Sequence, residues 1–506
     1  MDMNLGFLLE ISAQRYPNRE ALVFKDKRIS YQELDNIVSQ KANNLLELGV
    51  KKGDHVATLF TTRTEIIELI FAIWRIGAVI VPLNIRLAPP ELVYIVDNSD
   101  ATILVFEDKF EKVVRKIQPS VLKVKKLLCS GENPSTDFID FEATSKTKST
   151  QLPKVEVNES DIASIIYTSG TTGKPKGVVH SHRRWLWTVA HYHTGNTPED
   201  YHRLLTIFPF FHQAAFAFTS AMIGLGNTMV LLERFSPVEF LETIEKEKIT
   251  FLVNPPTAWN MVLRVPNLEK YDVSSATMVY SGSERMPLDT LEKLKKLFPG
   301  VEIGDGYGMT ETSTVSGRPE GYMNSKSQSV GIPQKFWKFR VINEEGKDCA
   351  PNEVGEIILS GPCMMEGYYK MPEKTAETIR DGWLYTSDMG YTDEDGFLYI
   401  VERKSNMIKS GGENIYPKEV ENVLFKHPKI QEAAVFGLPD PTYIQKVCAA
   451  VVVKPGEELT AEEVIEFVKE NIASFKKPKS VFFMESLPKN AVGKVLRNKL
   501  KERYVE

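Results

Sequence analysis

A short stretch, residues 167–177, combines the residue types that bind phosphate groups. It reads Y-T-S-G-T-T-G-K-P-K-G and holds three glycines, four Ser or Thr hydroxyls and two lysines. Glycines let the main chain approach a ligand closely. Successive N–H groups in such a loop form a concave anion site, which hydroxyl and ammonium groups strengthen. Because the apolar run 162–167 before it predicts a buried strand, the stretch is interpreted as a strand followed by a phosphate-binding loop.

Other phosphate-binding loops differ from this one in sequence. The P-loop of NTPases requires G-x-x-x-x-G-K-[ST]. Here Pro175 follows Gly173 and Lys174, so the magnesium-binding hydroxyl is missing and a backbone donor is lost. No G-x-G-x-x-G opens a helix, which argues against a dinucleotide-binding fold. A flexible surface turn is the simple alternative, although turns seldom combine so many phosphate donors.

A second motif, D-G-Y-G-M-T-E at residues 305–311, has the groups that ATP and a divalent cation need. The flanking glycines leave the face of Tyr307 open for a flat ring such as adenine. Thr310 can donate to a phosphate, and the Glu311 carboxylate is a hard ligand suited to Mg²⁺. Alone, the motif would also fit a turn at a strand end with a surface glutamate.

Three further segments carry candidate residues in the last quarter of the chain. Y-T-S-D ends at Asp388, whose simple alternative is a turn residue. The segment 397–417 contains Arg403 and Lys409, followed by two adjacent glycines. P-K-N-A-V-G-K ends at Lys494 within a basic tail, which a solvated charged surface would also explain.

Together these motifs resemble those of the adenylate-forming superfamily, which includes acyl-CoA synthetases, luciferases and peptide-synthetase adenylation domains, and they are nearest to fatty-acid or medium-chain acyl-CoA ligases. The resemblance runs over nearly the whole chain. It implies ATP contacts at Thr168, Ser169, Gly170, Thr171, Thr172, Gly173, Lys174, Lys176, Ser283, Glu284, Tyr307, Thr310, Asp388, Arg403 and Lys494, with Mg²⁺ on Thr168 and Glu311 and the CoA segment at Lys409, Gly411 and Gly412. Lys494, Glu311 and His212 are the expected catalytic residues.

The chain departs from the superfamily pattern at three places. Glu284 stands in the adenine-side segment, which is usually richer in Gly and Ala. Ser387 replaces the glycine of the usual T-G-D. At the hinge before the C-terminal domain, Ser405 and Asn406 stand where Asp or Lys is usual, although a hinge needs only to absorb a change of backbone dihedral.

The acid-binding pocket is expected around the aromatic run 207–213. Pro209 to His212 resembles the P-x-x-H segment that lines the acyl pocket in this superfamily, whereas a histidine beside aromatics is more often a packing residue. Amino-acid-activating members carry an aspartate nearby, and none stands between Pro209 and Phe218. An uncharged aromatic pocket fits an apolar acid better than an amino acid. Trp259 is expected in the core or as a wall of this pocket.

These parts imply an ATP-dependent carboxylic acid:CoA ligase that acts on fatty or other apolar acids and releases AMP and pyrophosphate through an acyl-AMP. A ligase that loads a phosphopantetheinyl carrier protein is the alternative within the superfamily. An unrelated P-loop NTPase and a catalytically silent nucleotide binder are alternatives outside it. Positioning and charge neutralisation supply most of the catalysis in such chemistry, which fits the absence of a G-x-S-x-G or Cys–His arrangement.

Composition places these motifs in a soluble multidomain protein. The 506 residues exceed one ordinary core, and a net charge of -5 gives no indication of nucleic-acid binding. The four cysteines are scattered without metal-like spacing, as in a reducing cytoplasm. The apolar run 66–83 contains Glu68 and Arg75 and is predicted to be a helix and a strand rather than a membrane span. A homodimer is compatible with the resemblance.

The order of predicted elements indicates an α/β fold. Strands at 55–60, 78–83 and 101–106 alternate with helices, which predicts parallel sheets with helices on their faces. The expected division is a large domain 1–403, including a distorted β-barrel region implied by the resemblance, and a small mobile α+β domain 404–506. The polar segment 130–153 is expected to be a long surface excursion. In the tail, helices are predicted at 417–426, 461–471 and 492–503.

Overall fold

The computed structural model describes residues 3–168, 174–193, 201–282, 286–319, 322, 325–404, 406–410, 413–489 and 495–504. The chain forms two compact units. Unit 1 comprises residues 1–338 and 360–384, and unit 2 comprises residues 339–359 and 385–506. The expected boundary between residues 403 and 404 stays a prediction.

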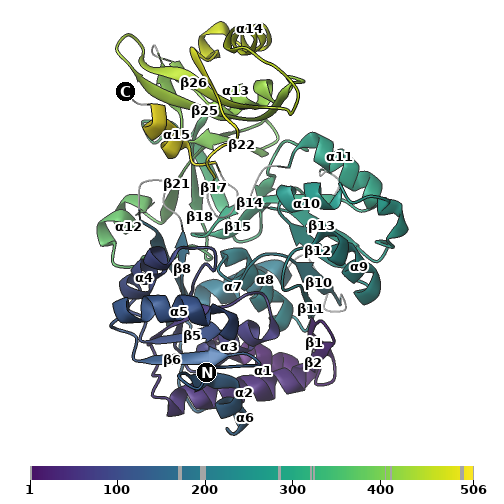
Figure 1. The fold of residues 1–506 in the computed structure, drawn as a ribbon, viewed down its shortest axis with the longest axis vertical. Helices are drawn as coiled ribbons and strands as arrows, with labels where there is room; N and C mark the ends of the chain where they lie inside the picture. The colour runs from purple at the N-terminus through teal and green to yellow at the C-terminus, as the bar shows by residue number, and fades with distance from the viewer. Residues whose placement is uncertain are drawn as a thin grey trace. The chain divides into compact units, whose positions relative to one another are not determined.

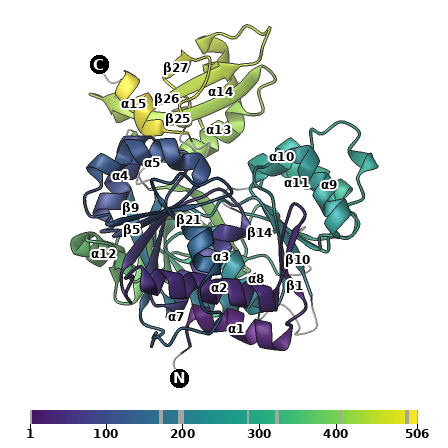
Figure 2. The same ribbon diagram turned by 60° about the horizontal axis from the view of Figure 1, so that its bottom comes forward.

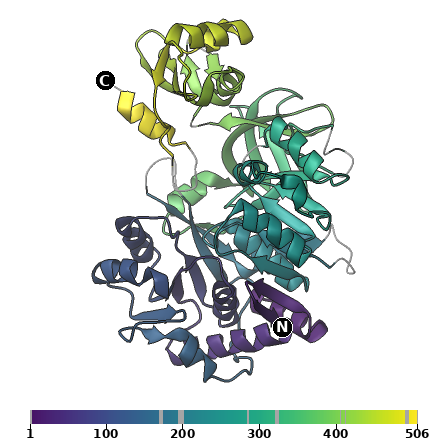
Figure 3. The same ribbon diagram turned by 45° about the vertical axis from the view of Figure 1, so that its right-hand side comes forward.

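Unit 1 contains two largely parallel sheets (Figure 1). The first has the order β16-β15-β14-β13-β12-β10-β11-β1-β2, with bounds Ile332–Pro333, Ser313–Gly317, Ile303–Met309, Met278–Ser281, Phe251–Asn254, Arg203–Thr206, Thr228–Leu231, Glu20–Phe24 and Lys27–Ser30. The second has the order β19-β9-β8-β4-β3-β5-β6-β7, with bounds Gly367–Tyr368, Lys176–Ser181, Ile162–Thr168, Val79–Pro82, His55–Leu59, Ile103–Glu107, Lys126–Ser130 and Ile139–Asp140. The purple hairpin β1–β2 joins the first sheet because β1 pairs in parallel with β11 (Figure 3).

The helices of unit 1 form three groups around these sheets. The group between the sheets is α1 (Leu5–Arg15), α2 (Tyr31–Glu47), α3 (Thr64–Arg75), α7 (His182–His193) and α8 (Gln213–Gly224). The outer group on the first sheet is α9 (Pro237–Glu247), α10 (Pro256–Val262) and α11 (Leu288–Leu297). The outer group on the second sheet is α4 (Pro89–Asn98) and α5 (Glu111–Ile117); α6 (Phe141–Lys146) and α12 (Pro372–Thr378) lie elsewhere in this unit.

Alternation along the strands produces this layered arrangement. On β5, Ile103 and Val105 belong to the core shared with the central helices, whereas Leu104 and Phe106 belong to the core under α4 and α5. Successive strand side chains point to opposite faces, so each sheet is covered by helices on both sides. Figure 2 shows α1, α2, α3 and α8 together between β5 and β10. The predicted parallel α/β architecture is therefore confirmed.

Local sequence explains how two of the central helices form. Ser30 and Glu33 form a capping box at the start of α2, which satisfies two otherwise unpaired backbone N–H groups. The apolar run from residue 66 forms α3 and β4, as expected. The two charged residues of this apolar run are buried and paired, because Glu68 meets Lys41 and Arg75 meets Ser39 and Asp35. Within the described residues, no helix is long and apolar enough to cross a membrane.

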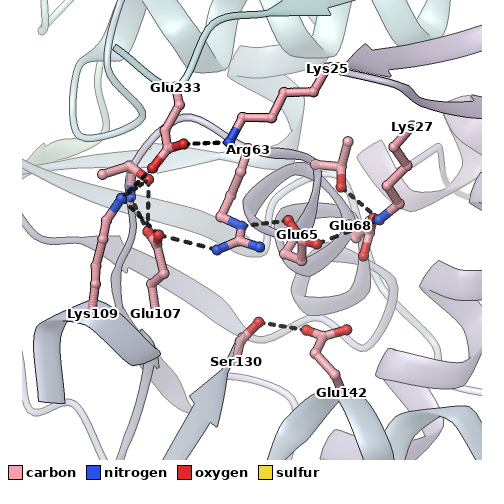
Figure 4. A network of polar contacts seen from close by, with 12 residues as sticks. Lys25, Lys27, Arg63, Glu65, Glu68, Glu107, Lys109, Ser130, Glu142 and Glu233 are labelled. Atoms are coloured by element: carbon pink, nitrogen blue, oxygen red, sulfur yellow. Dashed lines mark hydrogen bonds and ion pairs between the residues drawn. The ribbon is translucent and has the colours of Figure 1, made fainter. Parts of the chain in front are cut away.

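A charge network joins the elements of unit 1 (Figure 4). Lys41 Nζ lies 2.7 Å from Glu68 and 2.8 Å from Glu142, and its side chain is only 2% exposed. Arg63 bridges Glu65 at 2.6 Å to Glu107 at 3.1 Å, and Lys27 meets both Glu65 and Glu68. Lys109 continues the network from Glu107 to Glu233, to which Lys25 also binds. Each buried charge is thus compensated, as low-dielectric surroundings require.

The polar segment 130–153 differs from its expected form. It contains β7 and α6, and Phe141 on α6 is fully buried against the central helices. The next residue, Glu142, supplies one of the two carboxylates that neutralise Lys41. Phe138 is also buried, against Phe106. Buried aromatic side chains and an ion pair therefore help to attach this mostly polar segment to the core.

Unit 2 contains two smaller sheets. The first includes β17 (Lys338–Ile342), β18 (Gly355–Ser360), β21 (Trp383–Thr392) and β22 (Leu398–Arg403), while the two-residue β20 (Ile379–Arg380) pairs with the start of β21 within unit 1. The second has the order β24-β23-β26-β25 with β27 beside β26, and the bounds are Glu413–Ile415, Ile408–Ser410, Ile444–Val453, Ile430–Asp440 and Ser480–Phe483. Its helices are α13 (Pro417–Leu424), α14 (Ala461–Asn471) and α15 (Arg497–Tyr504). These elements confirm the predicted α+β tail.

Candidate active site

The two ends of the predicted phosphate-binding stretch lie on paired strands. β8 pairs antiparallel with β9, with Thr168 opposite Lys176 and Tyr167 opposite Gly177. The Tyr167 hydroxyl donates a 2.6 Å hydrogen bond to the side-chain oxygen of Asn98 at the end of α4. In a P-loop the segment after the loop is a helix, whereas here it is a strand. The local geometry therefore excludes the P-loop alternative.

Lys176 on β9 lies close to a tyrosine that contacts the second motif. β19 pairs with β9, placing Tyr368 opposite Val178. Lys176 Nζ lies 4.2 Å from the centroid of the Tyr368 ring, and the Tyr368 hydroxyl donates to Glu311 Oε1 at 2.8 Å. Tyr368 therefore joins the two predicted motifs. No sequence motif indicates Tyr368, because its role depends on strand pairing between distant segments.

The second motif forms a tight hairpin between β14 and β15. Tyr307 lies opposite Ser316, and a Cβ on Gly308 would come within 1.9 Å of the Ser313 carbonyl oxygen. Gly308 is thus required for the close approach of the two strands, in addition to any effect on the Tyr307 ring. Thr310 and Glu311 lie at the tip, between the two strands.

A buried histidine fixes that tip. His180 Nε2 donates to the Thr310 carbonyl at 2.9 Å, and its Nδ1 lies 3.3 Å from Ser164 Oγ, which also accepts from Trp185 Nε1 at 3.1 Å. Burial lowers the pKa of His180 well below its ordinary value. A neutral imidazole can use one nitrogen as donor and the other as acceptor, so His180 suits a positioning role. Sequence reasoning missed it.

Beside the β14–β15 hairpin lies a cavity of about 880 Å³. Its aromatic lining residues are in mutual contact: the Phe208 and Phe218 rings stack with centroids 6.3 Å apart, and Phe251 packs edge-on to Phe218 at 5.8 Å. Tyr307 and Thr310 line the same cavity. One cavity therefore contains an apolar wall and the predicted nucleotide-side residues.

His212 also lines this cavity, immediately before α8. Burial, assisted by the positive charge of Arg86, lowers the pKa of His212. The imidazole is therefore neutral at physiological pH, as suits a wall next to an apolar acid. Trp259, by contrast, is fully buried in the outer core, with its Nε1 donating to the Tyr280 carbonyl at 3.2 Å.

A row of polar residues crosses three parallel strands, at the carboxyl ends of β12 and β13 and at the third residue of β14. Asn254 is in register with Ser281, and Ser281 is in register with Asp305. All three are buried, and the side-chain amide of Asn254 and the hydroxyl of Ser281 have no hydrogen-bond partner within the described structure. Ligands of α/β proteins bind outside the carboxyl ends of the strands. Of this row, Ser281 and Asp305 line the cavity and add polar groups to it.

The Glu311 carboxylate has the chemistry of a magnesium ligand. Tyr368 occupies Oε1, and the other oxygen has no hydrogen-bond partner in the described parts of the chain. Mg²⁺ is commonly held by one or two carboxylates together with phosphate oxygens and water. The described residues contain no cluster of three or more His, Cys, Asp or Glu that would form an all-protein cage, and a single carboxylate beside a phosphate loop fits Mg²⁺ nonetheless.

Unit 2 brings together two predicted residues. Asp388 on β21 is opposite Arg403 on β22, and Arg403 Nε lies 2.5 Å from Asp388 Oδ1. Ser387 has a φ of 60°, the conformation that favours glycine, which explains why glycine is usual there. Lys409 lies exposed on β23.

The remaining predicted site residues lie outside the described part of the chain. They are Ser169, Gly170, Thr171, Thr172, Gly173, Ser283, Glu284, Gly411, Gly412 and Lys494, together with the hinge residue Ser405. On either side of residues 490–494, Lys489 and Val495 form an antiparallel bridge.

Comparison with known proteins agrees over nearly the full length. The model of the AMP-binding enzyme family matches residues 9–369, and that of the AMP-binding enzyme C-terminal domain matches residues 419–494. The chain is 35% identical to a long-chain-fatty-acid–CoA ligase of Bacillus subtilis (strain 168), over 99% of this chain and 95% of the relative. It is 33% identical to a feruloyl-CoA synthase of Amycolatopsis sp, over 97% of each chain.

A solved structure extends the similarity to the fold. The anthranilate CoA ligase in complex with anthranoyl-AMP superposes with a TM-score of 0.90 and 28% identity, covering 99% of this chain and 97% of that one. The acids named for these three proteins differ, since one is a long-chain aliphatic acid and two are aromatic.

Proposed function

The chain belongs to the AMP-binding enzyme family and is an AMP-forming acid–CoA ligase, and on this premise we propose that its acid is a fatty acid or another acid with an apolar body. The observation that carries the proposal is the aromatic wall formed by Phe208, Phe218 and Phe251 in the cavity that Tyr307 and Thr310 also line. Such a wall removes apolar surface of the acid from water, which contributes roughly 25 cal/mol per Å².

In the first step, a carboxylate oxygen of the acid attacks the α-phosphorus of ATP, and pyrophosphate leaves. We propose that the hydroxyls and lysines of the loop 168–176 bind the phosphates and that Tyr307 stacks on the adenine. Mg²⁺, held by Glu311 and Thr168, would neutralise charge on the phosphate oxygens. Tyr368 orients the Glu311 carboxylate, and His180 fixes the backbone at Thr310.

In the second step, the CoA thiolate attacks the acyl carbonyl of the acyl-AMP, and AMP leaves. We propose that Asp388 and Arg403 bind the ribose and that Lys409 belongs, with Gly411 and Gly412, to the CoA segment. We also propose that Lys494 acts only in the first step, because the small C-terminal domain (404–506) moves between the steps. The neutral His212 lies beside the acyl group and excludes water from it.

The test is formation of AMP and acyl-CoA from ATP, CoA and a panel of acids running from acetate through long-chain fatty acids to benzoate and cinnamate. An optimum among medium-chain, long-chain or aromatic acids is expected. Highest kcat/KM for acetate or for a short hydrophilic acid would contradict the apolar-body proposal.

Lys494→Ala tests the division between the two steps. We expect it to abolish acyl-AMP formation, measured as acid-dependent pyrophosphate exchange, while supplied acyl-AMP is still converted to acyl-CoA. Equal loss of both half-reactions would refute the separate role of Lys494.

The proposal also covers the cellular location and the oligomeric state of the enzyme. We propose that the enzyme acts in the cytoplasm, where ATP and CoA are available, and that it forms a homodimer. Light scattering of the purified chain tests the second point, and a mass of 57.3 kDa in solution would refute it.

A further inference from the structure

A buried arginine faces the proposed acid-binding cavity without a matching acceptor. Arg318 follows β15, lines the cavity and is 4% exposed. Its Nη2 donates to the Ile303 carbonyl at 3.3 Å, a long hydrogen bond. Its Nε and Nη1 have no hydrogen-bond partner in the part of the chain that the structure describes. Three of its five N–H donors, one on Nε and two on Nη1, are therefore unused.

Such an arrangement is costly for a residue with only a packing role. A guanidinium stays protonated in proteins, and an incompletely paired buried charge destabilises the fold unless an acceptor reaches it. Burial lowers the pKa of Arg318, while the negative charge of Asp305 opposes that effect. Asp305 thus balances part of the charge but leaves the donors available.

The position of Arg318 in the cavity indicates which part of an acid would meet it. Its guanidinium is bound to the carbonyl at the start of β14, whereas Thr310 and Glu311 follow the end of that strand. Strands rise about 3.3 Å per residue, so seven residues separate these points by up to roughly 23 Å. Ile303 is in register with Val279, and the preceding Met278 is in register with Phe251 of the aromatic wall. The Arg318 guanidinium therefore lies toward the end of the cavity that the aromatic wall lines. Ser281, whose buried hydroxyl also lacks a partner, lines the same cavity.

We propose that Arg318 is a specificity-determining residue that binds a second oxygen of the acid, remote from the carboxyl group that is activated. The acid then has an apolar body against the aromatic wall and a hydrogen-bond-accepting oxygen at its far end, either a carboxylate or a neutral hydroxyl or carbonyl. This inference rests on the proposed acid–CoA ligase function and concerns only the far end of the substrate.

The test compares matched acids on matched variants. Straight-chain and phenyl-containing acids of equal length, ending in methyl, hydroxyl or carboxylate, are assayed for kcat/KM of acyl-CoA formation with the wild type, Arg318→Met and Arg184→Met. Arg184 is the control because it is also buried, with two guanidinium nitrogens unpartnered among the described residues, but does not line the cavity.

The wild type should prefer an oxygen-terminated acid over its methyl-terminated partner by tenfold or more at the best length. Arg318→Met should bring that ratio to about one or invert it, while Arg184→Met changes all acids by one common factor. Preference for the carboxylate over the hydroxyl would assign an anionic substrate, and equal preference a neutral oxygen.

Two results would overturn the proposal. One is a wild-type preference for the methyl-terminated acid at every length. The other is a common loss for all acids in Arg318→Met, as in the Arg184 control. If Arg318→Met does not fold, Arg318→Gln replaces it. An unchanged preference for the carboxylate-terminated acid in Arg318→Gln would also overturn the proposal. Failure of every acid to give AMP and acyl-CoA would instead refute the proposed function itself.

Discussion

Removing one hydroxyl group tests whether the hydrogen bond to Glu311 matters for nucleotide binding. In Tyr368→Phe the buried ring stays, so its packing and its contact with Lys176 at 4.2 Å are retained. Only the 2.8 Å hydrogen bond to Glu311 Oε1 is lost. Hydrogen bonds to charged groups contribute about 1.5–3 kcal/mol when buried. Since Glu311 is half-buried and water can replace the phenol, we expect a loss of about 1 kcal/mol, which is about fivefold.

The assay is magnesium-dependent pyrophosphate exchange, with the KM for Mg-ATP and the KM for the acid determined separately. We expect the KM for Mg-ATP to rise about fivefold and the KM for the acid to stay unchanged. Tyr369→Phe is the matched control, because the neighbouring hydroxyl donates to Asp100 at 2.7 Å instead of to Glu311. It should leave both constants unchanged.

A double-mutant cycle separates orientation of Glu311 from a general disturbance. In a Glu311→Gln background the carboxylate is absent, so Tyr368→Phe should have little additional effect on Mg-ATP binding. The reasoning would be refuted by additive losses in the cycle, by an equal rise in the KM for the acid, or by the same defect in Tyr369→Phe.

Three further predictions concern stability. Lys41→Met should lower the free energy of unfolding by about 3 kcal/mol in denaturant titration, because it removes the shortest ion pair of the buried Glu68 and the ion pair of the partly buried Glu142. Lys293→Met at an exposed ion pair should cost under about 1 kcal/mol, and similar losses in the two variants would contradict the role of burial. Burial raises the pKa of Glu65, but the hydrogen bond from Arg63 outweighs it and lowers that pKa to about 2. The ionised Glu65 therefore stabilises the fold above the ordinary glutamate pKa of about 4.5, and this stabilisation is lost as the pH falls toward 2. Glu65→Gln should flatten that part of the stability–pH curve, and an unchanged slope would disprove the assignment. Ser387→Gly should raise the free energy of unfolding by up to about 1 kcal/mol, because φ of 60° is strained for serine, and a destabilised variant would contradict that strain.

Features encoded in local sequence could be predicted well. The capping box at Ser30 and the apolar run of α3 specify their elements through neighbouring residues alone. The expectation for residues 130–153 was wrong because Phe141 and Glu142 find their partners on distant elements. A polar composition does not reveal that Phe138 and Phe141 are buried or that Glu142 pairs with the buried Lys41.

In the candidate active site, too, contacts between distant segments could not be predicted from the sequence. Glu311 and the loop lysines were predicted from their motifs, but the residue that joins them, Tyr368, lies 57 positions beyond Glu311 in the sequence. Its position follows from the pairing of β19 with β9. His180 likewise acts through a backbone carbonyl 130 positions away. Spacing within a motif cannot reveal either contact, since both depend on how strands from separate segments pair.

The cysteines help to explain why the acyl group must leave on an external thiol. Only the thiolate is a competent nucleophile. Burial raises the pKa of Cys129 to about 12 and that of Cys448 to about 11, and it also raises the pKa of Cys349 and Cys363. All four are therefore protonated at neutral pH, and three of them are buried. An acyl-AMP formed on this protein has no competing cysteine nucleophile in the chain, so its transfer depends on the incoming thiolate of CoA.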